Sequence, residues 1–208
     1  MSEPTPSPVV FPANPSRIVL TGFMGAGKTT VGALLAERLG WVFVDSDRVV
    51  EARAGMTIAE IFEKRGEAAF REMEAEAIQE IAGGERRVIA IGGGALEIAA
   101  TRDLLGSVPE CLIVFLEAPL EAMIARCAGH AGGPVRPVLA DRNRLAERWD
   151  QRLPWYRQAH LTVDTAELSP EAVAECIAER LESGTRSQLE NECESVSSSA
   201  RGKSGVPA

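Results

Sequence analysis

The octet at residues 22–29 carries the strongest chemical signal in this chain. It reads Gly-Phe-Met-Gly-Ala-Gly-Lys-Thr and fits the phosphate-binding pattern G-x-x-x-x-G-K-[ST]. Glycines let successive backbone N–H groups turn toward one anion, while Lys28 offers a positive charge to the β- and γ-phosphates. The Thr29 hydroxyl is a suitable ligand for Mg²⁺. The alternative is a glycine-rich turn with an exposed lysine, and the flanking elements decide between them.

The residues on either side of the octet favour the phosphate site. Arg17–Thr21 reads as a buried strand, and Thr30–Leu39 reads as a helix. The octet therefore opens a helix N-terminus, where unpaired N–H groups and the helix dipole favour negative charge. We predict a nucleoside triphosphate site formed by Gly25, Ala26, Gly27, Lys28, Thr29 and Thr30.

Two carboxylates follow the second expected strand. Asp45 and Asp47 flank Ser46 at its carboxyl end, which is where open α/β sheets bind ligands. If the chain stays extended there, residues two apart share one side and both carboxylates face the phosphates. One could then hold Mg²⁺ while the other accepts a hydrogen bond from a substrate hydroxyl. The alternative is that one of them caps a helix starting near Arg48.

Three consecutive glycines, Gly92, Gly93 and Gly94, follow the third expected strand. Such a run costs chain entropy and is expected where a backbone approaches a ligand closely, although a tight strand-to-helix turn is the alternative. Many phosphate-loop enzymes carry an acidic residue at such a strand end. Because this chain has glycine there, Asp45 is the better metal candidate.

Arginines occur at three positions that could bind an anion. Arg71 lies on an expected helix, Arg152 precedes Pro154-Trp155-Tyr156, and Arg136 follows a glycine-rich stretch and precedes Pro137. A guanidinium group suits carboxylate and phosphate alike. The alternative for each is a solvated surface charge. A mobile segment with a rigid cationic tip is typical of a lid, so we expect Arg136 to close over the transferring phosphate.

The chain alternates apolar runs with helical patterns, which predicts an α/β fold with a doubly wound parallel sheet. Thr57 with Glu60 predicts a capping box, Gly66 closes that helix, and Ser169 with Pro170 predicts the start of the last helix. The expected strands are Arg17–Thr21, Trp41–Asp45, Arg87–Ile91, Cys111–Glu117 and Leu161–Asp164.

Composition sets the broad class of protein. The 208 residues carry a formal net charge of −8, which argues against general nucleic-acid binding. No apolar run is long enough for a membrane span, no signal peptide is visible, and the four cysteines form no C-x-x-C pair. We expect a cytoplasmic monomer with a disordered leader at 1–15, a folded domain at 16–182 and a disordered tail at 183–208.

Six motifs follow one another along the chain: the octet, Asp45-Ser46-Asp47, Phe70-Arg71-Glu72, Gly92-Gly93-Gly94-Ala95, Arg136-Pro137-Val138-Leu139 and Arg152 before Pro154-Trp155-Tyr156. In this order they resemble the shikimate kinase family over about residues 16–182. The resemblance implies a P-loop NTPase-type three-layer sandwich with a five-stranded parallel sheet, similar to the nucleoside monophosphate kinases. It also implies transfer of the ATP γ-phosphate to the 3-hydroxyl of shikimate, on the path to chorismate and the aromatic amino acids.

The resemblance also assigns roles to residues. The Mg²⁺ ligands would be Thr29 and Asp45, and Arg126 would flank adenine together with the loop at 165–170. The catalytic residues would be Lys28, Asp47 and Arg136. Shikimate would be bound by Asp47, Arg71, Gly92, Gly93, Gly94 and Arg152.

Two alternatives remain at this point. Another small-molecule kinase of the same fold, such as a gluconate kinase, would also use arginines for a substrate carboxylate. A nucleotide-dependent switch is the alternative from another class. The guanine-binding motif N-K-x-D does not occur in the chain, which argues against a GTPase switch.

Overall fold

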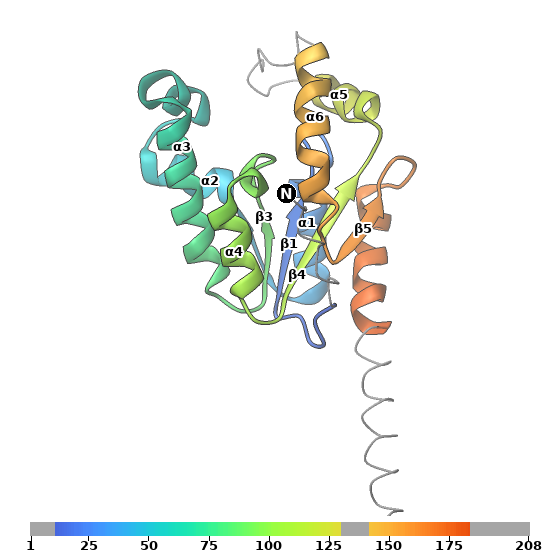
Figure 1. Cartoon of the computed structure of the whole chain (residues 1–208). Helices are drawn as coiled ribbons and strands as arrows, with labels where there is room; N and C mark the ends of the chain where they lie inside the picture. The colour runs from blue at the N-terminus through green and yellow to red at the C-terminus, as the bar shows by residue number, and fades with distance from the viewer. Residues whose placement is uncertain (1–10, 130–141, 184–208) are drawn as a thin grey trace, which may run out of the picture.

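Five runs of mainly aliphatic residues form one parallel sheet with helices on both sides (Figure 1). The computed structural model describes residues 11–129 and 142–183. All five expected strands are confirmed, with Trp41 and Ile91 just outside the observed bounds. In the order β2-β3-β1-β4-β5, these are β2 (Val42–Asp45), β3 (Arg87–Ala90), β1 (Arg17–Thr21), β4 (Cys111–Glu117) and β5 (Leu161–Asp164).

The central strand explains the apolar pattern of the sequence. Val19 of β1 is in register with Ile89 of β3 on one side and with Ile113 of β4 on the other. Every residue of β1 is buried, because helices cover both faces of a parallel sheet. Strand β2 lies at the edge, where Val42 is 61% exposed.

The helices divide between the two faces of the sheet. In Figure 1, α4 and α6 lie in front of the sheet and α1 lies behind it. An ion pair of 2.7 Å between Arg38 of α1 and Glu175 of the last helix places these two helices together. The helices are α1 (Lys28–Leu39), α2 (Ser46–Ala54), α3 (Ile58–Ala82), the 3₁₀ turn η1 (Ala95–Glu97), α4 (Ala99–Ser107), α5 (Leu120–Gly129), α6 (Arg142–Tyr156) and a last helix at 170–183.

The expected helix signals are found at their positions. Thr57 and Glu60 form a capping box at the start of α3, and Ser169 Oγ accepts a hydrogen bond of 3.2 Å from Ala172 N. Gly66 was expected to close a helix, and it adopts φ 82° and ψ 171° within α3. This conformation divides α3 at Gly66, so the second part of the helix, which carries Arg71, takes its own direction.

The core consists of two clusters. The larger one spreads over both faces of the sheet and is mainly aliphatic. The smaller one lies between α2 and α3 and contains Val50, Ile61, Phe70 and Ala77. Phe70 is 4% exposed, and burying it fixes the rotation of α3 and therefore the position of the neighbouring Arg71.

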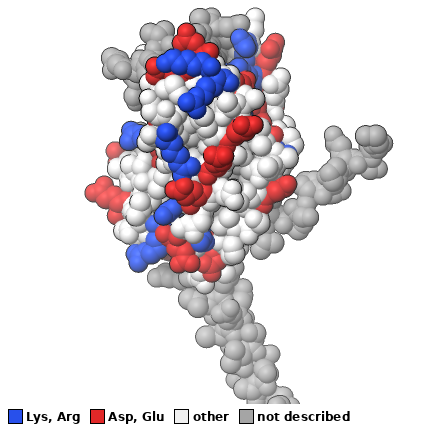
Figure 2. Space-filling model, turned by 90° about the vertical axis from the view of Figure 1, so that its left-hand side faces the viewer, with Lys and Arg blue, Asp and Glu red and all other residues white. Residues whose placement is uncertain are grey.

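The surface over α2 and α3 carries charges of both signs. Figure 2 shows acidic and basic side chains interspersed across this face, without a continuous field of one sign. Within residues 11–129 and 142–183, no helix has the length and apolar character to cross a membrane. Phe11, in the expected leader, packs against the core. The described part of the chain does not include residues 1–10, residues 184–208 or Arg136.

The half-buried His160 makes stability depend on pH. Its Nδ1 accepts a hydrogen bond of 3.0 Å from Ile113 N, and burial lowers the pKa of the imidazole from its usual 6.5. His160 is therefore protonated more easily in the unfolded chain than in the folded one. The neutral imidazole stabilises the folded state fully above pH 6.5, and this contribution is lost as the pH falls through the pKa of His160 in the folded state. We expect the free energy of unfolding, measured with urea, to fall more steeply between pH 7.5 and 5.5 in the wild type than in His160→Asn. Equal slopes would contradict this role.

Candidate active site

The phosphate loop joins β1 to α1 in a conformation that requires glycine. Gly25 has φ 77°, and a Cβ there would lie 2.2 Å from the carbonyl oxygen of Met123. Helix α1 begins at Lys28, two residues earlier than predicted, so Lys28, Thr29 and Thr30 all lie in its first turn. Gly27 makes no side-chain cap, and no acidic residue lies in this turn. The helix N-terminus is therefore suited to an external anion.

The two predicted metal ligands lie side by side. Thr29 Oγ1 donates a hydrogen bond of 2.9 Å to Asp45 Oδ2, across the gap between α1 and β2. Hydroxyl and carboxylate oxygens are the ligands that Mg²⁺ prefers, and it usually completes its shell with water and phosphate oxygens. This pair therefore fits Mg²⁺ bound together with a nucleotide. The described residues contain no group of three or more His, Cys, Asp or Glu side chains that could hold a metal alone.

The Asp45–Asp47 segment differs from its prediction. The chain does not stay extended there, because Asp45 Oδ1 accepts a hydrogen bond of 3.0 Å from Asp47 N and α2 begins at Ser46. Asp45 is thus the N-cap of α2 and also contacts Thr29. Capping a helix and lying beside Thr29, which were alternatives in the sequence, are therefore combined in this one residue. Asp47 lies in the first helical turn, with Oδ1 only 3.0 Å from the position of a Cβ at Gly92. The two carboxylates therefore diverge, one toward Thr29 and one toward the glycine run.

The first and last glycines of the 92–94 run leave space for charged side chains. A Cβ at Gly92 would lie 2.1 Å from Glu74 Oε1, and one at Gly94 would lie 2.5 Å from Arg71 Nη2. A Cβ at Gly93 would be 3.6 Å from Arg152 Nη1. None of the three has a positive φ, so lack of space rather than backbone conformation explains Gly92 and Gly94, whereas a Cβ at Gly93 would make only ordinary van der Waals contacts. The run is the point where groups from α3 and α6 approach one backbone.

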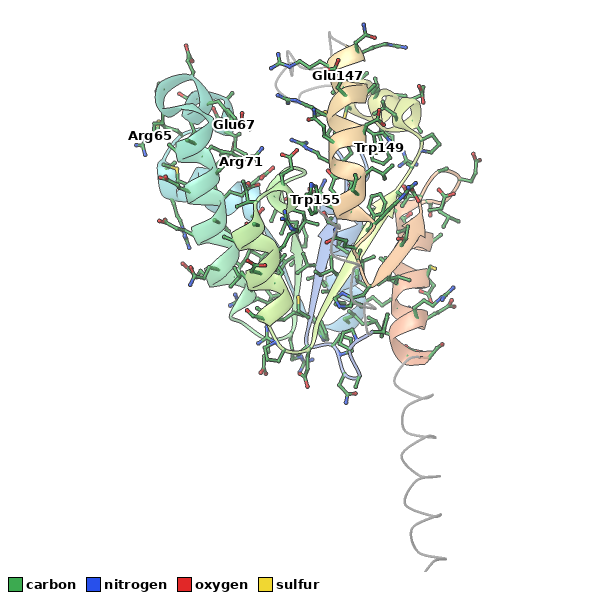
Figure 3. All side chains as sticks on the ribbon, viewed as in Figure 1. Arg65, Glu67, Arg71, Glu147, Trp149 and Trp155 are labelled. Carbon is green, nitrogen blue, oxygen red and sulfur yellow. The ribbon has the colours of Figure 1, made fainter. Side chains whose placement is uncertain are left out.

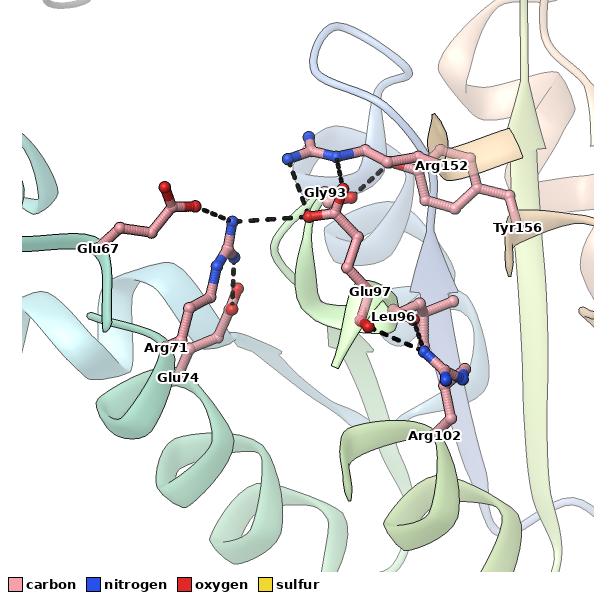
Figure 4. A network of polar contacts seen from close by, with 9 residues as sticks. All are labelled: Glu67, Arg71, Glu74, Gly93, Leu96, Glu97, Arg102, Arg152 and Tyr156. Carbon is pink, nitrogen blue, oxygen red and sulfur yellow. Dashed lines mark hydrogen bonds and ion pairs between the residues drawn. The ribbon is translucent and has the colours of Figure 1, made fainter. Parts of the chain in front are cut away.

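Arg71 and Arg152 approach this backbone from opposite sides. Figure 3 shows Arg71 and Glu67 on the side of α3 that faces α6, and Arg65 on the other side of the helix. Between the two arginines lies Glu97 of η1 (Figure 4). Arg152 Nε donates to Glu97 Oε1 at 2.9 Å, and Arg71 Nη2 is 3.9 Å from Glu97 Oε2. Two guanidinium groups from different helices thus contact one carboxylate.

Glu74 is the most buried carboxylate of the site. It is 2% exposed and accepts a hydrogen bond of 2.7 Å from Arg71 Nη1 through Oε2. Its other oxygen, Oε1, has no hydrogen-bond partner in the described part of the chain. Burial raises the pKa of Glu74, opposed by pairing with Arg71 and reinforced by the charge of Asp47. The site therefore holds a buried acceptor beside Asp47.

Aromatic contacts connect the phosphate loop to α6. The fully buried Phe23 ring meets Trp149 edge to face at 5.7 Å, and the Arg152 guanidinium lies 5.7 Å from the same ring. One turn after Arg152, Tyr156 donates a hydrogen bond to the Gly93 carbonyl and stacks on Phe115. The loop and the helix that carries Arg152 are thus held as one unit.

Arg126 and the loop after β5 also come together as expected. Arg126 Nη1 donates to Thr165 Oγ1 at 3.1 Å, and its other nitrogen binds the carbonyl oxygens of Thr165 and Ala166. Within the phosphate loop, Lys28 Nζ donates to the carbonyl oxygens of Gly22 and Phe23 at 2.7 and 3.0 Å. Arg136, the predicted lid arginine, lies outside the described residues.

Some polar residues of this site were not predicted from the sequence to belong to it. Glu74 is three residues after Arg71 and Tyr156 is four after Arg152, so helical spacing could have identified both. Ser46 accepts a hydrogen bond of 3.1 Å from Gly92 N, which ties α2 to the glycine run. Glu97 follows the glycines without any periodic signal, and only the path of η1 places it between the arginines.

The family is decided by sequence comparison. The family model described as shikimate kinase matches residues 24–182, which is most of the chain. The chain belongs to the shikimate kinase family. A shikimate kinase from Geobacter sulfurreducens is 45% identical over 170 residues, covering 80% of this chain and 91% of that protein. One from Gloeobacter violaceus is 42% identical, covering 79% and 93%.

Solved structures agree with this assignment. A shikimate kinase from Acinetobacter baumannii in complex with shikimate is 37% identical, with a TM-score of 0.74 and coverage of 82% of this chain and 95% of that chain. A shikimate kinase from Aquifex aeolicus is 34% identical, with a TM-score of 0.69 and coverage of 80% and 96%. The P-loop kinase fold implied by the resemblance is therefore confirmed, including its five-stranded parallel sheet.

The glycine run yields a matched pair of variants. We expect Gly92→Ala to lower kcat/KM at least about tenfold, because the new Cβ would displace the buried Glu74 carboxylate and Asp47. In Gly106→Ala the new Cβ meets nothing within 4 Å on α4, so activity is kept and stability rises by up to about 1 kcal/mol. Steady-state kinetics and thermal melts measure both. Full activity in Gly92→Ala would contradict the proposed crowding.

Proposed function

We propose that this chain transfers the γ-phosphate of ATP to the 3-hydroxyl of shikimate through the site described above. The observation that carries the proposal is the meeting of two binding sets at one edge of the sheet. The phosphate loop lies on one side of the glycine run, and Asp47, Arg71 and Arg152 lie around it. A nucleotide and a small hydroxy acid bound there would be neighbours.

The substrate side offers complementary groups for shikimate, which has one carboxylate and three hydroxyls. Arg71 and Arg152 would bind the carboxylate, because a guanidinium group forms strong charge-assisted hydrogen bonds with it. Asp47 and the unpaired Oε1 of Glu74 would accept hydrogen bonds from hydroxyls. Asp47 would orient the attacking oxygen.

The chemistry demands positioning and charge stabilisation more than a strong base. Lys28 and the loop amides of residues 25–30 would hold the phosphates, and Arg136 would approach the transferring group from the lid. Arg126 and Thr165 would flank adenine. Thr29 and Asp45 would hold Mg²⁺, which neutralises charge on the phosphate oxygens when it is bound. We propose a cytoplasmic monomer that acts on ATP and shikimate, without nucleic acid or membrane partners.

A panel of hydroxy acids tests the function. We expect ADP release from ATP and Mg²⁺ to rise strongly with shikimate and to stay near the background rate with gluconate, because the proposed hydroxyl acceptors are a buried Glu74 and a partly buried Asp47 that suit one arrangement of hydroxyls. A coupled ADP assay measures this. Faster release with gluconate would indicate another small-molecule kinase. Slow hydrolysis that no acid stimulates would indicate a nucleotide switch.

Arg152→Ala tests the carboxylate site. The variant removes a charged donor that is 8% exposed, so we expect KM for shikimate to rise about 10- to 100-fold and KM for ATP to change little. Arg157→Ala, at an exposed position five residues later and just after the end of α6, is the control and should behave as the wild type. An equal rise of KM for shikimate and for ATP in Arg152→Ala would contradict a role of Arg152 in binding the substrate carboxylate.

A further inference from the structure

Glu97 holds the position that a bound carboxylate would need. Its two oxygens accept from Arg152 Nε at 2.9 Å and from Arg152 Nη2 at 3.3 Å, and Oε2 is also 3.9 Å from Arg71 Nη2. Two parallel N–H···O contacts are the strongest way for a guanidinium to hold a carboxylate. Glu97 therefore occupies one complete edge of Arg152 (Figure 4).

The backbone of Glu97 is fixed independently of its carboxylate. Arg102 Nη1 donates to the carbonyl oxygens of Leu96 and Glu97 at 2.6 and 3.0 Å. The same guanidinium stacks over the Trp155 ring at 3.8 Å, which ties η1 to the helix that carries Arg152. The Glu97 side chain itself is 31% exposed. It can rotate into water while η1 stays in place.

The charges around the two arginines favour a rotation of the Glu97 side chain away from Arg152 when an acid binds. Arg71 and Arg152 are paired with three carboxylates, those of Glu67, Glu74 and Glu97. An incoming acid would add a further negative charge beside two guanidinium groups that are already paired with these three carboxylates. Glu74 is 2% exposed and cannot leave, and Glu67 contacts Arg71 from the solvent side with 60% exposure. Glu97, the bidentate partner of Arg152, is the carboxylate that an acid must exchange.

We propose that Glu97 is a specificity-determining residue that competes within the chain with the substrate carboxylate for Arg152 and Arg71. This inference rests on the proposed function, since it concerns the acid that this site binds. Exchange of one carboxylate for another gains little net energy, so the contacts of the hydroxyl groups must supply the affinity. The site thereby rejects acids that carry a carboxylate without correctly placed hydroxyls.

Glu97→Gln tests this competition with three ligands. These are shikimate, its neutral methyl ester, and 1-cyclohexene-1-carboxylate, which keeps the ring acid and lacks the hydroxyls. We expect KM for shikimate to fall about fivefold and Kd for the hydroxyl-free acid to fall at least as much, by calorimetry. KM for the ester should not fall, because the ester brings no charge to exchange.

Glu147→Gln is the matched control. Glu147 is exposed on α6 (Figure 3), and within residues 11–129 and 142–183 no hydrogen bond or ion pair joins it to Arg71 or Arg152. The variant changes net charge by the same amount and should leave all three values unchanged. Circular dichroism and thermal melts check whether Glu97→Gln is folded, and Glu97→Ala provides a second variant for which we expect changes in the same direction.

Three results would overturn the inference. A higher KM for shikimate in both Glu97 variants would show that Glu97 positions the arginines. Equal shifts for acid and ester would show a structural effect, and an unchanged Kd for the hydroxyl-free acid would show no competition. Failure of the proposed function would give a different result, because neither shikimate nor its ester would then stimulate ADP release by the wild type. The Kd of the hydroxyl-free acid, compared by calorimetry between the wild type and Glu97→Gln, would still test the role of Glu97.

Discussion

The close approach of charged side chains to the backbone of residues 92–94 is the constraint on which the site depends. Parallel strands end at one edge of the sheet, so β1, β2 and β3 deliver the phosphate loop, the Asp45–Asp47 turn and the glycine run to the same place. Side chains at the run would exclude Glu74 and Arg71 from their positions. A site for an anionic nucleotide beside an acid requires this crowding of opposite charges, and absent Cβ atoms make it possible.

The same packing couples the two halves of the site. Phe23 belongs to the phosphate loop, yet its ring contacts Trp149 and lies near the guanidinium of Arg152. Tyr156 links α6 to the glycine run, and Ser46 links α2 to it. A displacement of α6 would therefore move Arg152, the arginine proposed to bind the acid, and disturb the phosphate loop. Rigid contacts of this kind keep reacting groups at a fixed distance and orientation, which matters most when catalysis depends on positioning.

Much of this arrangement could be predicted from the sequence, and the exceptions have physical reasons. The strands and the octet were predictable because buried parallel strands are apolar runs and because phosphate binding needs glycine, lysine and a hydroxyl at fixed spacing. The course of residues 45–47 was predicted only in part. A helix starting near Arg48 with an aspartate as its cap was one of two alternatives, but the hydrogen bond from Asp47 N to Asp45 starts the helix already at Ser46, so the chain does not stay extended there. Glu97 could not be assigned at all. Its position follows from tertiary contacts of Arg102 with η1 and Trp155, which no local pattern encodes.

A crystal structure of the protein grown with ADP and shikimate tests the central claim most directly. The account predicts that the shikimate carboxylate binds Arg71 and Arg152, that a ring hydroxyl lies at Asp47 facing the nucleotide, and that the Glu97 carboxylate has left Arg152 Nε. Shikimate bound away from Asp47 and Arg152 would contradict the shared site. Shikimate seated there with the Glu97–Arg152 pair intact would contradict the exchange of carboxylates.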